Sequence, residues 1–305
     1  MKKNKNKKEN LKICVHIPLY LDVNKKKQVQ NFKKVCNSFL KFSKKVDIFV
    51  HTNKAIKFKS KKIKYLQYKF EKDHPYYLTW YPRKLMFKQR NSYDVFIYCE
   101  DDIYFSKQNF FYWLKNKDLC LYNKFNLGFL RVENKGKILY SADQITQSNQ
   151  FVELGNKKFI VIKSPHCSFW IYDKNEFNNF TKTKYFHFKW KLLSISGVLL
   201  IREMATYGWH GIDINGKDME RYFATIIPIK NNRFEKNSFI KHLTNNYSKN
   251  PAGLFGTFKV SQIISKNLKR FTPQTLFDKL IKKIKYDMYY YSRINLKKYF
   301  KQKLN

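Results

Sequence analysis

A short hydrophobic run that ends in three carboxylates constrains this chain more than any other stretch. Val95–Tyr98 are bulky residues of the kind that form a strand buried on both faces. Glu100, Asp101 and Asp102 follow one residue later, and three like charges this close together are unfavourable unless a cation lies among them. In open α/β sheets, ligands bind beyond the carboxyl ends of the strands. The run therefore predicts a ligand site at a sheet edge, with a solvated acidic turn as the alternative.

The chain before the acids alternates between strand and helix patterns. We expect strands at Lys12–Tyr20, Val46–Asn53 and Ile63–Phe70, and helices at Gln28–Phe42 and from Trp80 to about Asn91. This order predicts an α/β domain with a Rossmann-type mixed, mainly parallel sheet flanked by helices. Neither GxGxxG nor GxxxxGK[ST] is present, so the sequence has no motif that would indicate a dinucleotide-binding site or a P-loop.

The acids and their position after these elements resemble the DxD-type metal motif of GT-A glycosyltransferases. Glu100 stands where that family usually has its first Asp. The resemblance covers roughly Leu11 to Tyr247, and it implies a GT-A-like fold, a nucleotide-sugar donor and a glycan or lipid-linked acceptor. It also implies Asp102 as a metal ligand, with Glu100 and Asp101 near the sugar nucleotide. Carboxylate ligands shared with phosphate oxygens suit Mn²⁺ or Mg²⁺.

Residues at the ends of the first two predicted strands lie where GT-A enzymes commonly hold the base and ribose. This group consists of Pro18, Tyr20, His51 and Asn53. Tyr20 could stack on a base, or it could be a partly buried loop aromatic. Arg83 and Lys84 lie near the start of the next helix, where cations and the helix N-terminus suit a diphosphate. The alternative for these two cations is an ordinary solvated face.

The catalytic base is expected among carboxylates in the later part of the chain. Arg202-Glu203-Met204 loosely resembles the xED-like motif of inverting GT-A enzymes, and Glu203 could deprotonate an acceptor hydroxyl. The alternative is a surface carboxylate paired with Arg202. Asp213 and Asp218 are rival bases.

His242 resembles the late histidine with which GT-A enzymes often complete the metal site. It follows the acids by about 140 residues, and a neutral imidazole beside carboxylates is an ordinary ligand set for Mn²⁺. The alternative is a loop histidine without a ligand role. If both assignments hold, the loop that carries His242 folds back over the carboxyl edge of the sheet to meet Asp102.

Composition bounds the environment of the protein. The formal net charge is +40, from 62 Lys and Arg against 22 Asp and Glu. Few of these cations are Arg, which argues against specific recognition of nucleic acid. The explanation we favour for the charge is compositional bias together with binding to an anionic membrane surface. Five scattered cysteines without CxxC spacing predict buried, reduced thiols in a cytoplasmic protein. We expect a protein in the cytoplasm or peripheral at the inner membrane face.

Three segments are predicted. Residues 1–10 form a disordered basic tail, residues 11–250 the GT-A-like domain, and residues 251–305 a basic helical extension. Apolar residues between Phe277 and Tyr291 recur at helical spacing among lysines, so this helix either lies on anionic lipid or packs against the domain.

These patterns favour a metal-dependent glycosyltransferase in surface polysaccharide biosynthesis. A nucleotidyltransferase that uses the same strand-end acids is the first alternative. A non-enzymatic basic nucleic-acid-binding protein is the second.

Overall fold

The computed structural model describes part of the chain. The described residues are 10–21, 26–58, 60–70, 75–143, 146–163, 168–187, 202, 205–206, 210, 221–250, 255–273 and 288. The chain divides into two units, Met1–Lys269 and Arg270–Asn305, and the first contains the elements discussed below. Four predicted features lie outside the described residues: Glu203, Asp213, Asp218 and all but Met288 of the helix Phe277–Tyr291.

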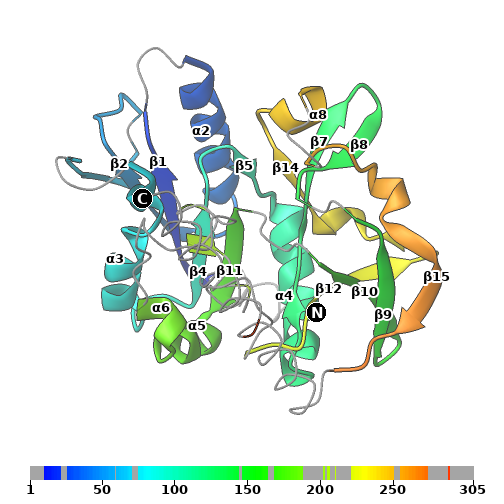
Figure 1. Cartoon of the computed structure of the whole chain (residues 1–305). Helices are drawn as coiled ribbons and strands as arrows, with labels where there is room; N and C mark the ends of the chain where they lie inside the picture. Colours follow the sequence, from blue (N-terminus) through cyan, green and yellow to red (C-terminus); the bar gives the residue numbers. More distant parts are fainter. Residues whose placement is uncertain are drawn as a thin grey trace, which may run out of the picture. The chain divides into compact units, whose positions relative to one another are not determined.

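A five-stranded sheet forms the first half of this unit (Figure 1). Its strands, in spatial order, are β11 (Phe169–Asp173), β4 (Val95–Cys99), β1 (Lys12–Leu19), β2 (Lys45–Thr52) and β3 (Ile63–Gln67). β4, β1, β2 and β3 are parallel, and only β11 is antiparallel to its neighbour. All five residues of β4 are buried, as expected for a central strand. The carboxyl ends of the four parallel strands therefore meet at one edge.

Helices cover both faces of this sheet. α2 (Lys26–Phe39) packs on one face, and α3 (Pro82–Gln89), α5 (Lys174–Thr181) and α6 (Lys184–His187) pack on the other. On the α3 face, Phe96 and Tyr98 of β4 share a core cluster with Met86 of α3 and Phe177 of α5. Phe96 and Tyr98 are two residues apart, which is the alternation of a strand with one face toward α3.

α4 (Lys107–Tyr122) leads into the second half of the unit and lies centrally in Figure 1. A capping box between Ser106 and Asn109 starts the helix by satisfying free backbone donors of its first turn. Phe110 stacks on Phe42 of the first half, and the Tyr112 hydroxyl donates to the carbonyl of Gly128 at 3.0 Å. The helix thus contacts both halves.

The second half consists of mainly antiparallel strands in two sheets. The six-stranded sheet contains β13 (Arg233–Phe234), β12 (Thr225–Lys230), β10 (Lys157–Ile162), β9 (Ser148–Leu154) and β15 (Ile264–Arg270), with β6 (Asn126–Leu127) beside β12. The four-stranded sheet contains β5 (Ile103–Tyr104), β14 (Phe239–His242), β7 (Leu130–Lys135) and β8 (Ile138–Ser141). β5 directly follows the acids, so the four-stranded sheet begins at the edge of the first one.

The predicted α/β class is confirmed, with a mainly parallel sheet flanked by helices. The sequence also predicts a helix at Lys107–Lys115, and α4 continues beyond it to Tyr122, because residues up to Cys120 remain buried. β15 is part of the six-stranded sheet. Cys14, Cys36, Cys99 and Cys120 are buried free thiols. Among the described residues, no helix is long and apolar enough to cross a membrane.

Candidate active site

The acids form a turn between two sheets. Glu100 follows β4, and the backbone N–H of Ile103 donates to the Glu100 carbonyl at 3.2 Å to close the turn. β5 then pairs with β14 in antiparallel register, which places His242 opposite Ile103. The backbone N–H of Leu243 donates to the carbonyl of Asp102 at 2.8 Å. These backbone bonds bring residues 140 positions apart to the same point at the sheet edge.

His242 lies between two carboxylates. Its Nε2 is 3.0 Å from Oδ2 of Asp102, and its Nδ1 is hydrogen-bonded to Oε1 of Glu133. Only 5% of His242 and 1% of Glu133 are exposed. The second oxygen of Glu133 accepts the backbone N–H of Ser248, and the Tyr247 ring stacks on the imidazole at 5.6 Å. The imidazole is therefore fixed with Nδ1 toward Glu133 and Nε2 toward Asp102.

The charges in this cluster are strongly coupled. Burial would lower the pKa of His242, but its hydrogen bonds to Asp102 and Glu133 raise that pKa to about 9. Burial would raise the pKa of Asp102, but the hydrogen bond and charge of His242 hold it below its usual value. Burial and the neighbouring charge of Asp102 raise the pKa of Asp101. An additional positive charge at this point would stabilise the ionised form of Asp101.

The donor atoms fit a divalent cation. Two neighbouring ligands of an octahedral ion with bonds of about 2.1 Å are roughly 3.0 Å apart. The observed separation of His242 Nε2 and Asp102 Oδ2 is 3.0 Å. Glu133 holds the other imidazole nitrogen, which is the usual outer partner of a metal-binding histidine. No group of three or more His, Cys, Asp or Glu in the described part of the chain could hold a metal. Substrate oxygens or water could complete the coordination of an ion held by Asp102 and His242.

A buried arginine adds a fixed positive charge to the cluster. Arg131 donates to the Ser168 hydroxyl at 3.1 Å and forms an ion pair with Asp143, in which both side chains are buried. Its guanidinium lies 5.5 Å from the centre of the Tyr247 ring. The charge of Arg131 also lowers the pKa of Asp102. The charge of Arg131 therefore offsets part of the repulsion between the carboxylates of the cluster, while Arg131 itself does not lie between Asp102 and His242.

The sequence analysis missed Arg131, Asp143 and Glu133. A signal was present for two of them, because Arg131 and Glu133 are two residues apart in Leu127–Glu133, a stretch whose composition predicts a strand, and so lie on the same face. That strand also ended in Glu133, the same pattern that marked the acids after Tyr98. β14 pairs with β7 in parallel, which brings His242 beside Glu133.

Asn53, Tyr20 and Asp101 lie at the carboxyl edge of the first sheet. The Asn53 amide joins the ends of β1 and β2, since it accepts the Leu21 N–H at 2.8 Å and donates to the Leu21 carbonyl at 2.9 Å. Tyr20 is 42% exposed. Gln28 of α2 donates to the Tyr20 carbonyl and to Oδ2 of Asp101, both at 3.0 Å. Pro18 is buried within β1.

His51 is engaged within the protein. Its Nε2 is 2.9 Å from Nδ1 of His16, its Nδ1 is 2.8 Å from the Tyr68 hydroxyl, and His16 Nε2 is 2.9 Å from Oε1 of Gln89. Burial lowers the pKa of both imidazoles, so both are neutral at pH 7. The alternation along β2 places His51 between the sheet and α3. Both of its ring nitrogens therefore have partners within the protein, and its predicted contact with a nucleotide stays a prediction.

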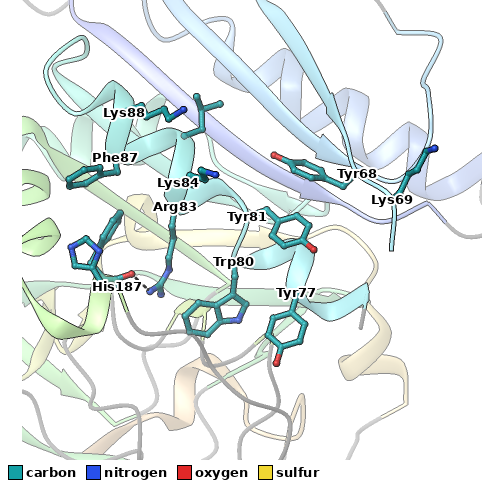
Figure 2. Close-up of a pocket in the computed structure, with 12 residues that line it drawn as sticks. Tyr68, Lys69, Tyr77, Trp80, Tyr81, Arg83, Lys84, Phe87, Lys88 and His187 are labelled. Atoms are coloured by element: carbon teal, nitrogen blue, oxygen red, sulfur yellow. Dashed lines mark hydrogen bonds between the residues drawn. The ribbon is translucent and has the colours of Figure 1, made fainter. Parts of the chain in front are cut away.

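Arg83 and Lys84 differ sharply although they are adjacent. Arg83 is buried and donates to the carbonyls of Tyr185, Phe186 and Ala205 at 2.8 to 3.0 Å. Its guanidinium also lies 4.2 Å from the centre of the Trp80 ring. These bonds tie α3 to α6, so the diphosphate role expected of Arg83 does not fit its placement. Lys84 is exposed and lines a cavity beside α3 (Figure 2).

Comparisons with known proteins give limited information. No protein family and no curated protein matches the chain. Among solved structures, the chain is similar to that of S. aureus TarS residues 1–349, with 14% identity and a TM-score of 0.32. The similarity covers 55% of this chain and 49% of the TarS chain, so it spans about half of each. At these values the likeness carries no argument about activity, which must come from the site itself.

Proposed function

We propose that this protein is a metal-dependent glycosyltransferase that uses a nucleotide-sugar donor. The observation that carries the proposal is the contact between Asp102 and His242 at the carboxyl edge of a mainly parallel sheet. A carboxylate oxygen and an imidazole nitrogen at this spacing fit Mn²⁺ or Mg²⁺, and such an edge is where α/β proteins bind their ligands.

Asp102 and His242 would hold the ion, which would stabilise the negative charge that develops on the leaving nucleoside diphosphate. With an ion bound, Glu133 would accept the Nδ1 proton of His242 and so leave the Nε2 lone pair for the ion. Asp101, held by Gln28, is the acid closest to the β1 end and would face the donor from that side. The exposed ring of Tyr20 at this end would lie against the base or ribose.

The acceptor and the base complete the proposal. We expect a glycan or lipid-linked acceptor, and the excess of lysine suits a peripheral position on an anionic membrane surface. Glu203 and Asp213 remain our proposed bases, and each would need to come within hydrogen-bond reach of the acceptor hydroxyl.

The test is a donor panel. UDP-, GDP- and CMP-sugars are added to the full chain with Mn²⁺ or with EDTA, and the melting temperature and release of free nucleotide are measured. A ligand that binds the folded state raises the melting temperature. We expect one nucleotide class to do so only with the metal, and to be turned over slowly to free sugar. If every nucleotide-sugar leaves the melting temperature unchanged in Mn²⁺, the proposal is wrong.

A further inference from the structure

A cavity of about 800 Å³ lies beside α3 (Figure 2). Its walls come from the residues after β3, from the short helix η1 (Pro75–Thr79) and from α3 and α6. A cavity of this size is typical of small-molecule sites. In the order β4–β1–β2–β3, the end of β3 is three strand spacings from the end of β4, or roughly 14 Å.

Aromatic side chains form much of the wall. Tyr68, Tyr77, Trp80 and Tyr81 line it together (Figure 2). Tyr81 is held between two rings, since its ring centre is 4.7 Å from that of Tyr68 and 5.8 Å from that of Phe70 in a parallel stack. These contacts restrict the rings before a ligand arrives, so stacking against them costs little conformational entropy.

The buried histidines fix Tyr68 as part of this wall. Gln89 Oε1 is an acceptor, so His16 Nε2 donates to it and His16 Nδ1 is left as an acceptor. His51 Nε2 then donates to His16, and the Tyr68 hydroxyl donates to His51 Nδ1. The phenol oxygen is thereby turned toward the sheet. Tyr68 presents its ring to the cavity, which favours a ligand that has a ring or another apolar face.

The charge of the cavity is positive. Lys69, Lys84 and Lys88 line it with exposed side chains, and the described lining residues include no Asp or Glu. Lys84 and Lys88 are four residues apart on α3, so they lie one turn apart on the same helix face and repel each other. An anion bound between them would remove this repulsion.

We propose that this cavity binds an organic phosphate, with its ring against the aromatic wall and its phosphate at Lys84 and Lys88. The ligand is either a nucleoside phosphate or a sugar phosphate, since both combine an anion with a ring. Because the described lining residues carry no carboxylate and the end of β3 is three strand spacings from the end of β4, binding there needs no divalent metal. The inference therefore does not depend on the proposed transferase activity.

The test uses the full chain in EDTA at 0.15 M salt. Uridine monophosphate, glucose 1-phosphate and inorganic phosphate are titrated separately, with calorimetry as the readout. We expect at least one organic phosphate to bind about tenfold more tightly than inorganic phosphate, because stacking adds to the charge attraction. Tighter binding of uridine monophosphate would show that the ligand is a nucleoside phosphate, and tighter binding of glucose 1-phosphate would show that it is a sugar phosphate.

Variants locate the binding. The double substitution Lys84→Ala and Lys88→Ala should weaken the better ligand about tenfold through loss of charge-assisted hydrogen bonds. Lys34→Ala is the matched control, because Lys34 is an exposed helical lysine on α2, which covers the opposite face of the sheet. Equal losses in the control, equal binding of all three phosphates, or loss of binding in Asp102→Ala would each overturn the proposal.

Discussion

The two ends of one sheet edge carry opposite charge and are built in different ways. At the β4 end, Asp102 meets His242 and Glu133, which come from strands far along the chain. At the β3 end, Tyr68 and Lys84 lie within one short stretch of sequence. The acidic end thus depends on long-range strand pairing, whereas most residues of the basic end come from the stretch between Tyr68 and Lys88, with α6 added from later in the chain. Substitutions should affect metal and stability at the first end, and ligand affinity alone at the second.

The largest expected effect is a loss of stability with rising pH in the metal-free protein. The pKa of His242 is raised from the ordinary value of 6.5 to about 9. Because the folded-state value exceeds the unfolded one, its contribution is complete below pH 6.5 and disappears as pH rises through 9. The loss should reach roughly 3 kcal/mol in free energy of unfolding. Urea unfolding in EDTA at pH 6, 7.5 and 9 measures it.

The contribution of His242 is obtained by difference. Burial also raises the pKa of Glu176 to about 8, so this carboxyl titrates in the same interval. His242→Gln should remove only the contribution of His242 from the pH dependence of the free energy of unfolding. His187→Gln, at an exposed residue of α6, should leave this pH dependence unchanged. If the free energy of unfolding of His242→Gln changes with pH as steeply as that of the wild type, His242 is not the source of the pH-dependent stability.

The second prediction concerns metal affinity. Asp102→Ala should weaken Mn²⁺ binding about a hundredfold, or roughly 2.7 kcal/mol, because it removes one of two protein ligands. Adding His242→Ala should cost much less than it does alone, since residues that share one ion are not additive. Asp118→Ala is the control, because this carboxylate on α4 is 81% exposed. Strictly additive losses in calorimetry would show that the two side chains do not share an ion.

A smaller loss of Mn²⁺ affinity is expected when Glu133 is substituted. Glu133→Gln keeps an acceptor for the His242 Nδ1 proton but removes the negative charge, and outer partners of metal ligands contribute about tenfold or more in affinity. The concentration of free Mn²⁺, measured by electron paramagnetic resonance, should rise accordingly. Glu153→Gln serves as the control, because Glu153 is an exposed residue of β9. Unchanged Mn²⁺ affinity would limit Glu133 to a role in holding the loop at Ser248.

The sequence predicted what depends on local pattern. The strand at Val95–Cys99 and its acids were visible because a buried strand and a charged turn differ so clearly in composition. The place of His242 followed from its resemblance to a late family histidine, and the structure brings it to Asp102. Glu133 was missed because its partner is chosen by the pairing of β14 with β7, which no local pattern encodes.

Burial explains why two predicted nucleotide-binding residues, Arg83 and His51, instead form hydrogen bonds within the protein. Arg83 starts a helix, which suits anion binding, but α6 supplies carbonyls about a hundred residues later and draws the guanidinium inward. His51 ends a strand, yet the alternation of β2 turns it toward α3 instead of outward. Both side chains are polar at positions where either direction is compatible with the sequence. The direction of each side chain is decided by the element that supplies its hydrogen-bond partner, and that element is distant in the chain.

The smallest expected effect is at the rim of the basic end. Lys69 follows β3 and is exposed, so Lys69→Ala should weaken the organic phosphate only about twofold, within the range of exposed ion pairs. Raising the salt from 0.15 to 0.5 M should abolish the difference, because screening removes exposed attractions first. Mn²⁺ affinity should stay unchanged, since Lys69 belongs to the other end of the edge. A matching loss of Mn²⁺ affinity would instead show that the two ends are coupled, and the division between them would be wrong.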